Sequence, residues 1–341
     1  MKAVYITRPG DVGVLEIRET DPPPLNPAEV LIRVRAFGLN FADVLARMGI
    51  YPDAPKRPFV PGYEVAGEIE AWGDSVSGFK KGDRVLAMTD FGGYAEYAKA
   101  HFLATLPIPP HLNDVEAAAV PVNGLTAHFA LIERGNLHPG ERVLIQAAAG
   151  GVGLFAIQMA KEIGATVFGT AGSAGKCEFL KQMGVDHPIN YREEDFEDAV
   201  RQITKGEGVD LVLDSLGGEA LKKGYRILRA HGRLVAIGIA SMVGGRTRSL
   251  PRILLQFLKT PRILPYRLMS DDKSFIGINM KRLSEKRPDL LAAAFGQVMQ
   301  KVSEGKLRAF IARTFPLEEI AEAQRFLQDR KAIGKVVVTV G

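Results

Sequence analysis

Apolar residues change their spacing along this chain, from alternation in the first third to a strand–helix repeat in the middle. Short alternating runs such as residues 30–35 and 65–70 are separated by glycine-containing turns, which predicts short strands in a partly open barrel. From Arg142 onward, apolar runs alternate with helical stretches such as 154–163 and 177–183. That alternation is typical of a parallel sheet covered on both faces. The expected strands are residues 143–147, 166–169, 187–189, 209–213 and 234–237.

The remaining elements lie on both sides of this repeat. Helices are expected near residues 115–119, where Asn113 is a candidate N-cap, and over 124–134. After residue 270 the pattern predicts a strand at 275–278, a helix at 290–302 and a closing strand at 335–340. The sequence therefore predicts an α/β protein in which a Rossmann domain with a doubly wound parallel sheet, residues 125–265, is inserted into a mostly β catalytic domain built from residues 1–124 and 266–341.

Composition agrees with a soluble two-domain protein. The chain has 341 residues, of which 46% are hydrophobic and 24% charged. The net charge is +5, but basic residues are scattered between acids for most of the length, so we expect no nucleic-acid partner. The single cysteine, Cys177, excludes an intramolecular disulfide. With no leader at residues 2–6 and no apolar run approaching a membrane span, we expect a cytoplasmic protein.

A glycine-rich turn, Ala148–Gly153, joins the apolar run 143–147 to the predicted helix. Gly150 lets the backbone approach a pyrophosphate, and Gly153 lets the helix pack closely against the strand. The helix start offers free N–H groups and a positive dipole end. Ala148 stands at the first position of the motif, where glycine is usual. The strand–turn–helix context predicts a dinucleotide site, and a glycine-rich turn without a ligand is the alternative.

The residues after the second strand indicate which dinucleotide binds. An NAD enzyme presents an acid to the ribose about 20 residues after the glycine motif, whereas residues 166–177 contain none. Ser173 supplies a hydroxyl and Lys176 a cation, the groups that a 2′-phosphate needs. This favours NADPH. The alternatives are that Ser173 is only a helix N-cap and that Lys176 is a solvated residue of the first turn.

Several motifs in order resemble a known family over nearly the full length of the chain. They are residues 38–43 (GLNFAD), 61–64 (PGYE), 82–85 (GDRV), 123–127 (NGLTA) and 147–153. The chain resembles the zinc-free quinone oxidoreductase family of the medium-chain dehydrogenase/reductases. Residues 135–140, 166–170 and 214–218 carry a finer resemblance to its vesicle amine transport protein subgroup. The resemblance implies a GroES-like catalytic domain, NADPH in a cleft between the domains, and a homodimer joined through the edges of the Rossmann sheets.

The resemblance also implies roles for individual residues. Backbone groups at 150–152 would hold the pyrophosphate, Ser173, Lys176 and Tyr191 would surround the 2′-phosphate, and Lys335 would reach the cofactor from the last strand. Tyr191 has an alternative as an aromatic that packs a loop. The complete expected cofactor-binding set is Asn40, Thr126, Ala149, Gly150, Gly151, Val152, Thr170, Ser173, Lys176, Tyr191, Leu216, Gly238, Ile239 and Lys335.

The chemistry is expected to proceed without a metal. Zinc-dependent relatives need a cysteine, a histidine and a further cysteine or acid around the ion. Asn40 stands at the position of the first ligand and Tyr63 at that of the histidine. The histidines at 101, 111, 128, 138, 187 and 231 show no paired ligand spacing. We therefore predict no metal site.

Without a metal, hydrogen-bond donors must stabilise the charge that develops when a hydride is transferred. We expect Asn40 and Tyr63 to be the catalytic residues, orienting the carbonyl of a quinone or enone substrate. The alternatives are a helix N-cap for Asn40 and cleft packing for Tyr63. Tyr51 is a weaker candidate, and Asp43 is expected to serve structure. The predicted function is NADPH-dependent reduction of quinones or α,β-unsaturated carbonyls.

One segment, residues 249–269, is not explained by a minimal reductase. Leu250, Ile253, Leu254, Phe257 and Leu258 fall at helical spacing among basic residues, and Pro261 and Pro265 end the pattern. We favour a helix that packs over the cleft or against a dimer partner. A basic amphipathic surface that touches anionic membrane is the other interpretation. It supports the alternative function, an NADPH-binding membrane- or partner-associated adaptor with little turnover.

Overall fold

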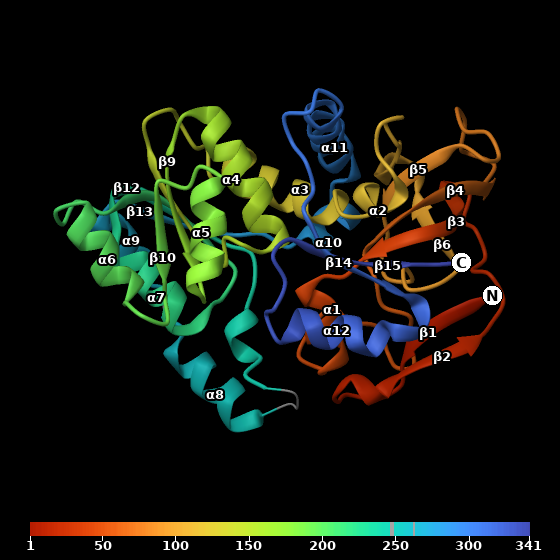
Figure 1. Ribbon diagram of the computed structural model, residues 1–341, viewed down its shortest axis with the longest axis horizontal. Coiled ribbons are helices and arrows are strands. Elements are labelled where there is room, and N and C mark those ends of the chain that lie inside the picture. The colour runs from red at the N-terminus through yellow and green to blue at the C-terminus, as the bar shows by residue number, and fades with distance from the viewer. Residues whose placement is uncertain (246–248, 262) are drawn as a thin grey trace. The chain divides into compact units, whose positions relative to one another are not determined.

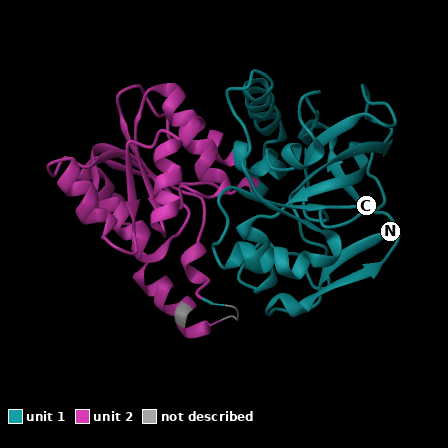
Figure 2. Ribbon diagram, viewed as in Figure 1, with its two compact units in different colours: residues 1–125, 245–248, 281–341 teal, residues 126–244, 249–280 magenta. Residues whose placement is uncertain are grey.

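In a computed structural model, the chain divides into two units, each with its own sheet (Figures 1 and 2). The structure describes residues 1–245, 249–261 and 263–341. Unit 1 consists of residues 1–125, 245–248 and 281–341, and unit 2 of residues 126–244 and 249–280. Unit 2 is therefore inserted in the sequence of unit 1.

Unit 1 is built on a mostly antiparallel sheet with the strand order β14-β15-β3-β4-β5-β7, in which β6 also pairs with β3. Alternate residues of β3, including Val30, Ile32 and Val34, are buried in its core, as expected for a strand with one face inward. The strands of unit 1, including the separate pair β1 and β2, are β1 (Lys2–Ile6), β2 (Leu15–Glu19), β3 (Glu29–Gly38), β4 (Glu64–Trp72), β5 (Arg84–Met88), β6 (Tyr97–His101), β7 (Thr105–Pro107), β14 (Ile311–Pro316) and β15 (Lys335–Thr339).

The helices of unit 1 are α1 (Phe41–Arg47), α2 (Asp114–Ala117), α10 (Met280–Lys286), α11 (Pro288–Ser303) and α12 (Ile320–Gln328). Helix α3 (Pro121–His128) crosses the boundary between the units and continues as a π-helical turn, Phe129–Glu133. In the described chain, residues 114–133 alone are long and apolar enough to span a membrane by length and composition, but 78% of the apolar window is buried. That burial is typical of a core helix.

Unit 2 contains a six-stranded parallel sheet with the order β10-β9-β8-β11-β12-β13. The order reverses between β8 and β11, so the carboxyl ends of these two strands form the topological switch point where such sheets bind ligands. The elements are β8 (Arg142–Ile145), β9 (Thr166–Ala171), β10 (His187–Asn190), β11 (Val209–Asp214), β12 (Leu228–Ala236), β13 (Lys273–Gly277), α4 (Gly151–Ile163), α5 (Ala174–Gln182), α6 (Phe196–Ile203), α7 (Gly218–Arg226), α8 (Leu250–Lys259) and α9 (Pro265–Asp271).

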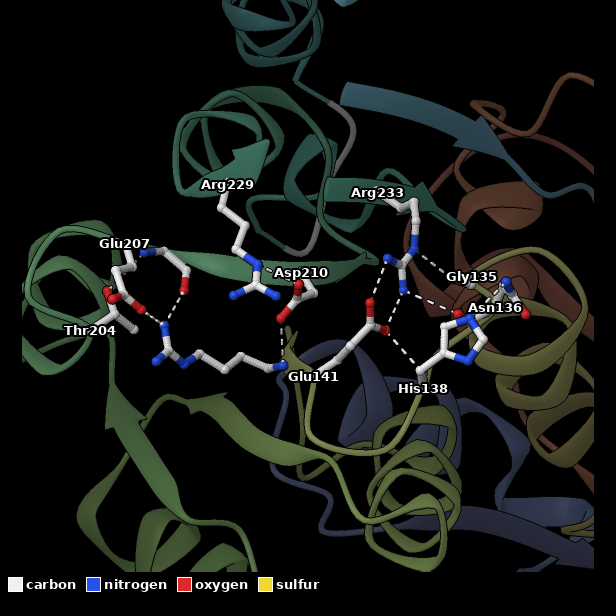
Figure 3. Close-up of polar contacts among 11 residues, drawn as sticks. Gly135, Asn136, His138, Glu141, Thr204, Glu207, Asp210, Arg229 and Arg233 are labelled. Carbon is white, nitrogen blue, oxygen red and sulfur yellow. Dashed lines mark hydrogen bonds and ion pairs between the residues drawn. The ribbon is translucent and has the colours of Figure 1, made fainter. Parts of the chain in front are cut away.

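Ion pairs tie together the amino ends of the central strands of this sheet (Figure 3). The N–H of Arg142, which begins β8, donates to Asp210 Oδ2 of β11 over 2.8 Å, and Arg229 of β12 pairs with the same carboxylate. Arg233 makes a two-point contact with Glu141 at 2.8 and 2.5 Å. These ion pairs hold the amino ends of the strands together. The loops that follow β8 and β11 lie at the opposite, carboxyl end of the sheet.

The α/β architecture with a Rossmann-type sheet is confirmed, and the structure differs from the expected layout at one boundary. Residues 266–280 were expected in the catalytic part, whereas they lie in unit 2, because β13 pairs in parallel with β12. Strand β12 also begins earlier than the expected residues 234–237. Its first half is exposed at residues 229–231, so it lacks the apolar signal of a buried strand.

Candidate active site

The turn 148–153 lies at the switch point of unit 2, between β8 and α4. Its backbone bends at Ala147, which has a φ of 51°. The N–H of Ala148 donates to the carbonyl of Thr170 over 2.9 Å, and the N–H of Ala147 donates to the Thr170 hydroxyl over 3.2 Å. Thr170, expected to bind the cofactor, is buried and holds the turn in place. Of the other expected residues nearby, Ala149 lies in this turn and Thr126 is buried in α3.

The start of α4 offers unpaired backbone donors. Gly150 is its N-cap and provides no side-chain acceptor. Three backbone N–H groups at this helix start make no hydrogen bond to any residue that the structure describes. They belong to Gly151, Val152 and Gly153. A Cβ on Gly153 would lie 2.4 Å from the carbonyl oxygen of Ala148, so glycine is required where the helix approaches the turn. Three free N–H groups at the positive end of a 13-residue helix fit the pyrophosphate of a dinucleotide.

Ser173, Lys176 and Tyr191 gather around the turn that follows β9. Ser173 is the N-cap of α5 and accepts from the N–H of Lys176 over 3.4 Å, which is the alternative interpretation raised for it. The Tyr191 N–H donates to Ala171 over 3.0 Å. Its hydroxyl lies over Gly172, where a Cβ would come within 2.5 Å of it. The Ser173 side chain is exposed, Lys176 is partly exposed and Tyr191 is 37% exposed, and their binding of a 2′-phosphate stays a prediction.

Leu216, Gly238 and Ile239 lie where the loops after β11 and β12 cross. The Ser215 carbonyl accepts from the N–H of Ala240 over 3.1 Å, and a Cβ on Gly238 would lie 2.8 Å from that oxygen. The Leu216 carbonyl accepts from the N–H of Ser241 over 2.9 Å. The structure thus brings the three expected nicotinamide residues together at the carboxyl end of the sheet.

Asp214, the last residue of β11, binds the backbone of this loop through its carboxylate. Its Oδ1 accepts from the N–H groups of Leu216, over 3.0 Å, and Gly217, over 2.7 Å. The side chain is fully buried. Burial raises the pKa of Asp214 to about 6, and the two backbone donors oppose that rise only in part. Sequence reasoning assigned Asp214 no role of its own.

In unit 1, Asn40 lies at the centre of a buried polar cluster. Its side-chain Nδ2 donates to Glu64 Oε1 over 2.8 Å, and its Oδ1 accepts from Lys335 Nζ over 2.7 Å. Lys335 also forms an ion pair with Glu64. Asn40 does occupy the N-cap position of α1, but its side chain makes no cap hydrogen bond. Asn40 therefore has the backbone position of the N-cap alternative, its amide bonds Glu64 and Lys335, and its orientation of a substrate carbonyl stays a prediction.

Glu64 and Lys335 fill a space that glycine leaves open. A Cβ on Gly38 would lie 2.5 Å from Lys335 Cε and 2.6 Å from Glu64 Oε1. Glu64 is fully buried, and its second oxygen accepts from the N–H of Val122 over 2.7 Å. Sequence reasoning quoted Glu64 as part of a motif without giving it a role. The available signal was a carboxylate at the start of a strand that is otherwise apolar for three residues.

Asp43 lies beside this cluster on α1. Its Oδ2 accepts from the Asn40 N–H over 2.7 Å and from the Tyr94 hydroxyl over 2.9 Å, while its Oδ1 has no partner in the described part of the chain. Full burial raises the pKa of Asp43 to about 7, against the two hydrogen bonds and the charge of Lys335. Asp43 links α1 to Tyr94, in keeping with its expected structural role.

Tyr63 is held by aromatic packing. Its ring centroid lies 4.9 Å from that of Phe91 and 6.2 Å from that of Tyr51. The hydroxyl is buried and meets no partner with hydrogen-bond geometry among the described residues. Burial raises the pKa of Tyr63 well above its ordinary value, so the phenol keeps its proton. The packing alternative accounts for the ring, and the Tyr51 side chain is a neighbour that also influences the pKa of the Tyr63 phenol.

The residues at the positions of zinc ligands do not fit a zinc centre. Asn40 and Tyr63 are poor zinc ligands, and the neighbouring carboxylate of Glu64 is bound to an ammonium group. Over the described ranges, no group of three His, Cys, Asp or Glu side chains is arranged to hold a metal ion.

Known protein families match the two parts of this chain separately. The alcohol dehydrogenase GroES-like domain matches residues 26–110, and the zinc-binding dehydrogenase family matches residues 151–294. The synaptic vesicle membrane protein VAT-1 homolog of Danio rerio is 39% identical over 318 residues, covering 93% of this chain and 65% of that protein. Its Homo sapiens counterpart is 36% identical over 328 residues, covering 96% and 83%.

Solved structures of similar proteins include reductases. The Escherichia coli quinone oxidoreductase complexed with NADPH superimposes with a TM-score of 0.87 at 27% identity, covering 99% of this chain and all of that one. The Pseudomonas syringae quinone oxidoreductase gives a TM-score of 0.87 at 30% identity, covering 99% of each chain. The CurK enoyl reductase gives 0.84 at 32% identity, covering 100% and 99%. The expected GroES-like and Rossmann architecture is therefore confirmed.

Proposed function

This chain belongs to the medium-chain dehydrogenase/reductase superfamily, in its quinone oxidoreductase-like branch. From that premise, we propose that it is a zinc-independent reductase of quinones or α,β-unsaturated carbonyls that uses NADPH. The observation that carries this proposal is the start of α4, where three backbone N–H groups without acceptors in the described chain meet the switch point of a parallel sheet. When bound there, NADPH supplies the hydride.

The turn after β9 supports NADPH rather than NADH. Ser173, Lys176 and Tyr191 surround it, and residues 166–177 contain no acid to bind a ribose 2′-OH. Charge-assisted hydrogen bonds to a phosphate contribute about 1.5–3 kcal/mol each. Lys176→Ala should therefore raise the Kd of NADPH by about 10- to 100-fold and leave that of NADH nearly unchanged, as measured by quenching of protein fluorescence. Equal losses for both cofactors would remove Lys176 from the phosphate site.

Asn40 and Tyr63 supply the donors for the substrate in this proposal. Hydride transfer to a quinone or enone leaves negative charge on the substrate oxygen, and donors aimed at that oxygen lower the barrier. A spectrophotometric screen of NADPH oxidation against quinones and enals tests the activity. Asn40→Ala and Tyr63→Phe are each expected to lower kcat/KM by about 10- to 100-fold. Unchanged values for both variants would contradict their role as orienting donors.

Helix α8 favours a second candidate function, contact with an anionic membrane. Its apolar side faces outward, with Leu250, Leu254, Phe257 and Leu258 between 59% and 68% exposed. Its polar Gln256 lies inward, 3.4 Å from the Ser241 hydroxyl. The favoured expectation, a helix that packs over the cleft or against a dimer partner, stays a prediction, because these exposures belong to a single chain. Exposed apolar groups on a helix favour association with a lipid surface.

The charge of this region fits negatively charged lipids. Between Glu219 and Asp271 the sequence contains no Asp or Glu. Lys259 and Arg267 are exposed on α8 and α9, and the segment also carries Arg262 and the side chain of Arg252, which lie outside the described part. We therefore keep an NADPH-binding membrane adaptor with little turnover as the second candidate.

Co-sedimentation with liposomes distinguishes the two candidates. Vesicles of phosphatidylserine and phosphatidylcholine should pellet the protein, and pure phosphatidylcholine vesicles should not, if α8 binds anionic membrane. Reversing Arg252, Lys259 and Arg262 to Glu should abolish pelleting, while Lys80→Glu with Lys81→Glu, at two exposed lysines of unit 1, should not. Equal recovery in the supernatant with both vesicle types would exclude the membrane function.

A further inference from the structure

The amide of Asn40 lies between two groups that each bond in only one direction. Glu64 Oε1 accepts from Nδ2 over 2.8 Å, and Lys335 Nζ donates to Oδ1 over 2.7 Å. A carboxylate has no hydrogen to give and an ammonium group has no lone pair to offer. Rotating the amide by half a turn would place its N–H groups against the ammonium and its oxygen against the carboxylate. The two charged partners therefore select one orientation of the amide.

Burial makes this selection strong. Glu64 is 0% and Lys335 3% exposed, so water cannot replace either partner when the amide turns. Gly38 provides the space for the pair, and Val122 occupies the second oxygen of Glu64 through its N–H. We refer to Glu64 and Lys335 together as the Asn40 clamp.

The clamp leaves one donor of Asn40 unused. An amide nitrogen carries two hydrogens, and Nδ2 makes a single hydrogen bond, to Glu64, within the described residues. Asn40 as a whole residue is 9% exposed, so it lies in the buried cluster without being fully closed off from solvent. The second N–H is thus fixed in direction before any ligand arrives, which is the condition under which a donor stabilises developing charge most effectively.

We propose that Glu64 and Lys335 are positioning residues that hold the Asn40 amide in one orientation, so that its second N–H points to the carbonyl oxygen of the substrate. The amide donates a hydrogen bond and transfers no proton. This inference rests on the proposed reductase function and adds to it: the ion pair acts through Asn40, without itself touching the substrate. Lys335, expected from the family resemblance to reach the cofactor, donates to the amide in this structure, and its contact with the cofactor stays a prediction.

A double-mutant cycle tests whether the clamp acts through Asn40. Glu64→Gln combined with Lys335→Met removes both charges and leaves no buried charge unpaired. With saturating NADPH, this pair of changes should lower kcat at least about 10-fold in the wild-type background, and Asn40→Ala should lower it about 100-fold. In the Asn40→Ala background the same pair should lower kcat less than about twofold. An equal loss in both backgrounds would overturn the proposal, because the pair would then act independently of Asn40.

A matched control separates positioning from general damage to the sheet. Arg35 and Glu68 form a half-buried ion pair at 3.2 Å on β3 and β4, the strands that end and begin next to Asn40 and Glu64. Arg35→Met with Glu68→Gln should leave kcat within about twofold of wild type, since neither side chain contacts the amide. If this control lowers kcat as much as the clamp variant does, the loss belongs to the sheet and the proposal fails.

A spectroscopic readout makes the test independent of activity. With selective ¹⁵N-asparagine labelling, the Nδ2 signals of Asn40 are assigned by their loss in Asn40→Ala. The two protons should be well separated and free of exchange cross-peaks in wild type, and should exchange in the Glu64→Gln, Lys335→Met variant. Rapid exchange in wild type would overturn the clamp. A wild-type protein that reduces no quinone or enone would instead refute the proposed function, whereas full kcat for Asn40→Ala in an active protein would refute this inference alone.

Discussion

At the scale of single residues, Asp43 shows how a buried acid couples this protein to pH. Its folded pKa of about 7 lies above the ordinary value of 3.8 because the carboxylate loses its water. Between these two values the folded protein holds a proton that the unfolded chain has released. Stability therefore falls as pH rises from about 4 to about 7, and no further loss from this group occurs above that range.

Asp43→Asn should remove this dependence. The slope that Asp43 contributes is at most about 1.4 kcal/mol per pH unit, so the variant should gain stability relative to wild type as pH rises from 5 to 8. Thermal midpoints measured at matched ionic strength give the comparison. A constant difference between the two proteins across this range would show that Asp43 is ionised in the folded state throughout.

Prediction from sequence at this scale depends on how far apart the interacting residues are. The N-cap alternative for Ser173 was visible in the sequence, because the backbone N–H that it accepts from, that of Lys176, is three residues away. The clamp could not be predicted in the same way, because Asn40 and Lys335 are 295 residues apart in sequence. Only the tertiary fold brings β15 beside β3, and no local pattern encodes that neighbour.

At the scale of elements, the loop after β11 depends on a single carboxylate. Asp214 Oδ1 holds the N–H groups of Leu216 and Gly217, and Gly217 has a φ of 70°. Such a conformation is populated readily by glycine alone, so the loop owes its shape to both the glycine and the acceptor below it. Loss of the acceptor should loosen the residues expected to bind the nicotinamide half.

Two substitutions at Asp214 should therefore weaken NADPH binding to different degrees. Asp214→Ala removes the carboxylate oxygen that accepts from both backbone N–H groups and should raise the Kd of NADPH about 10-fold, whereas Asp214→Asn retains one oxygen and should have a smaller effect. Fluorescence titration with NADPH measures both values. If the alanine variant binds NADPH as tightly as wild type, the loop does not need Asp214 for its bound shape.

Elements were predicted best where local pattern and tertiary role agree. The β8 strand, the glycine turn and α4 are consecutive in sequence, so one stretch of residues carried the whole motif. Helix α8 was predicted as a helix from the spacing of its leucines, but the direction in which they face was not. Spacing fixes only that Leu250, Leu254 and Leu258 share a face. Which face of a helix is buried depends on the tertiary contacts available to it.

At the scale of the whole molecule, unit 2 ends in an edge strand. Strand β13 pairs with β12 on one side and has no second neighbour in the described residues. Phe275 on this strand is 37% exposed. An edge strand with an exposed aromatic residue offers a surface for pairing with another chain, which supports the expected homodimer joined through the Rossmann sheets.

Phe275→Lys should therefore shift the protein from dimer to monomer, because a lysine on an edge strand discourages pairing. Light scattering after size exclusion should give about twice the chain mass of 37.1 kDa for wild type and about that mass for the variant. Ile17→Lys, at an exposed apolar residue on β2, is the control and should remain dimeric. A monomeric wild type would refute the dimer.

The overall layout was predictable because the change from alternating to strand–helix pattern marks where unit 2 begins. The C-terminal boundary of unit 2 was harder to locate from the sequence. Residues 266–280 were expected in the catalytic part because the pattern there resembles the short strands of unit 1. Their place in unit 2 follows from pairing with β12, a strand whose exposed start at Arg229 and His231 hid half of its length.

The residue at position 38 indicates which related sequences can hold an ion pair like that of Glu64 and Lys335. A residue with a Cβ at this position would come within 2.5 Å of Lys335 Cε and 2.6 Å of Glu64 Oε1, so a larger residue at 38 would displace the ion pair from its present place. Asn, Glu and Lys at the positions of 40, 64 and 335 should therefore occur together with glycine at 38. On the proposal made above, a relative that has alanine there should lack this arrangement of the three side chains, and four positions of its sequence are enough to make the comparison.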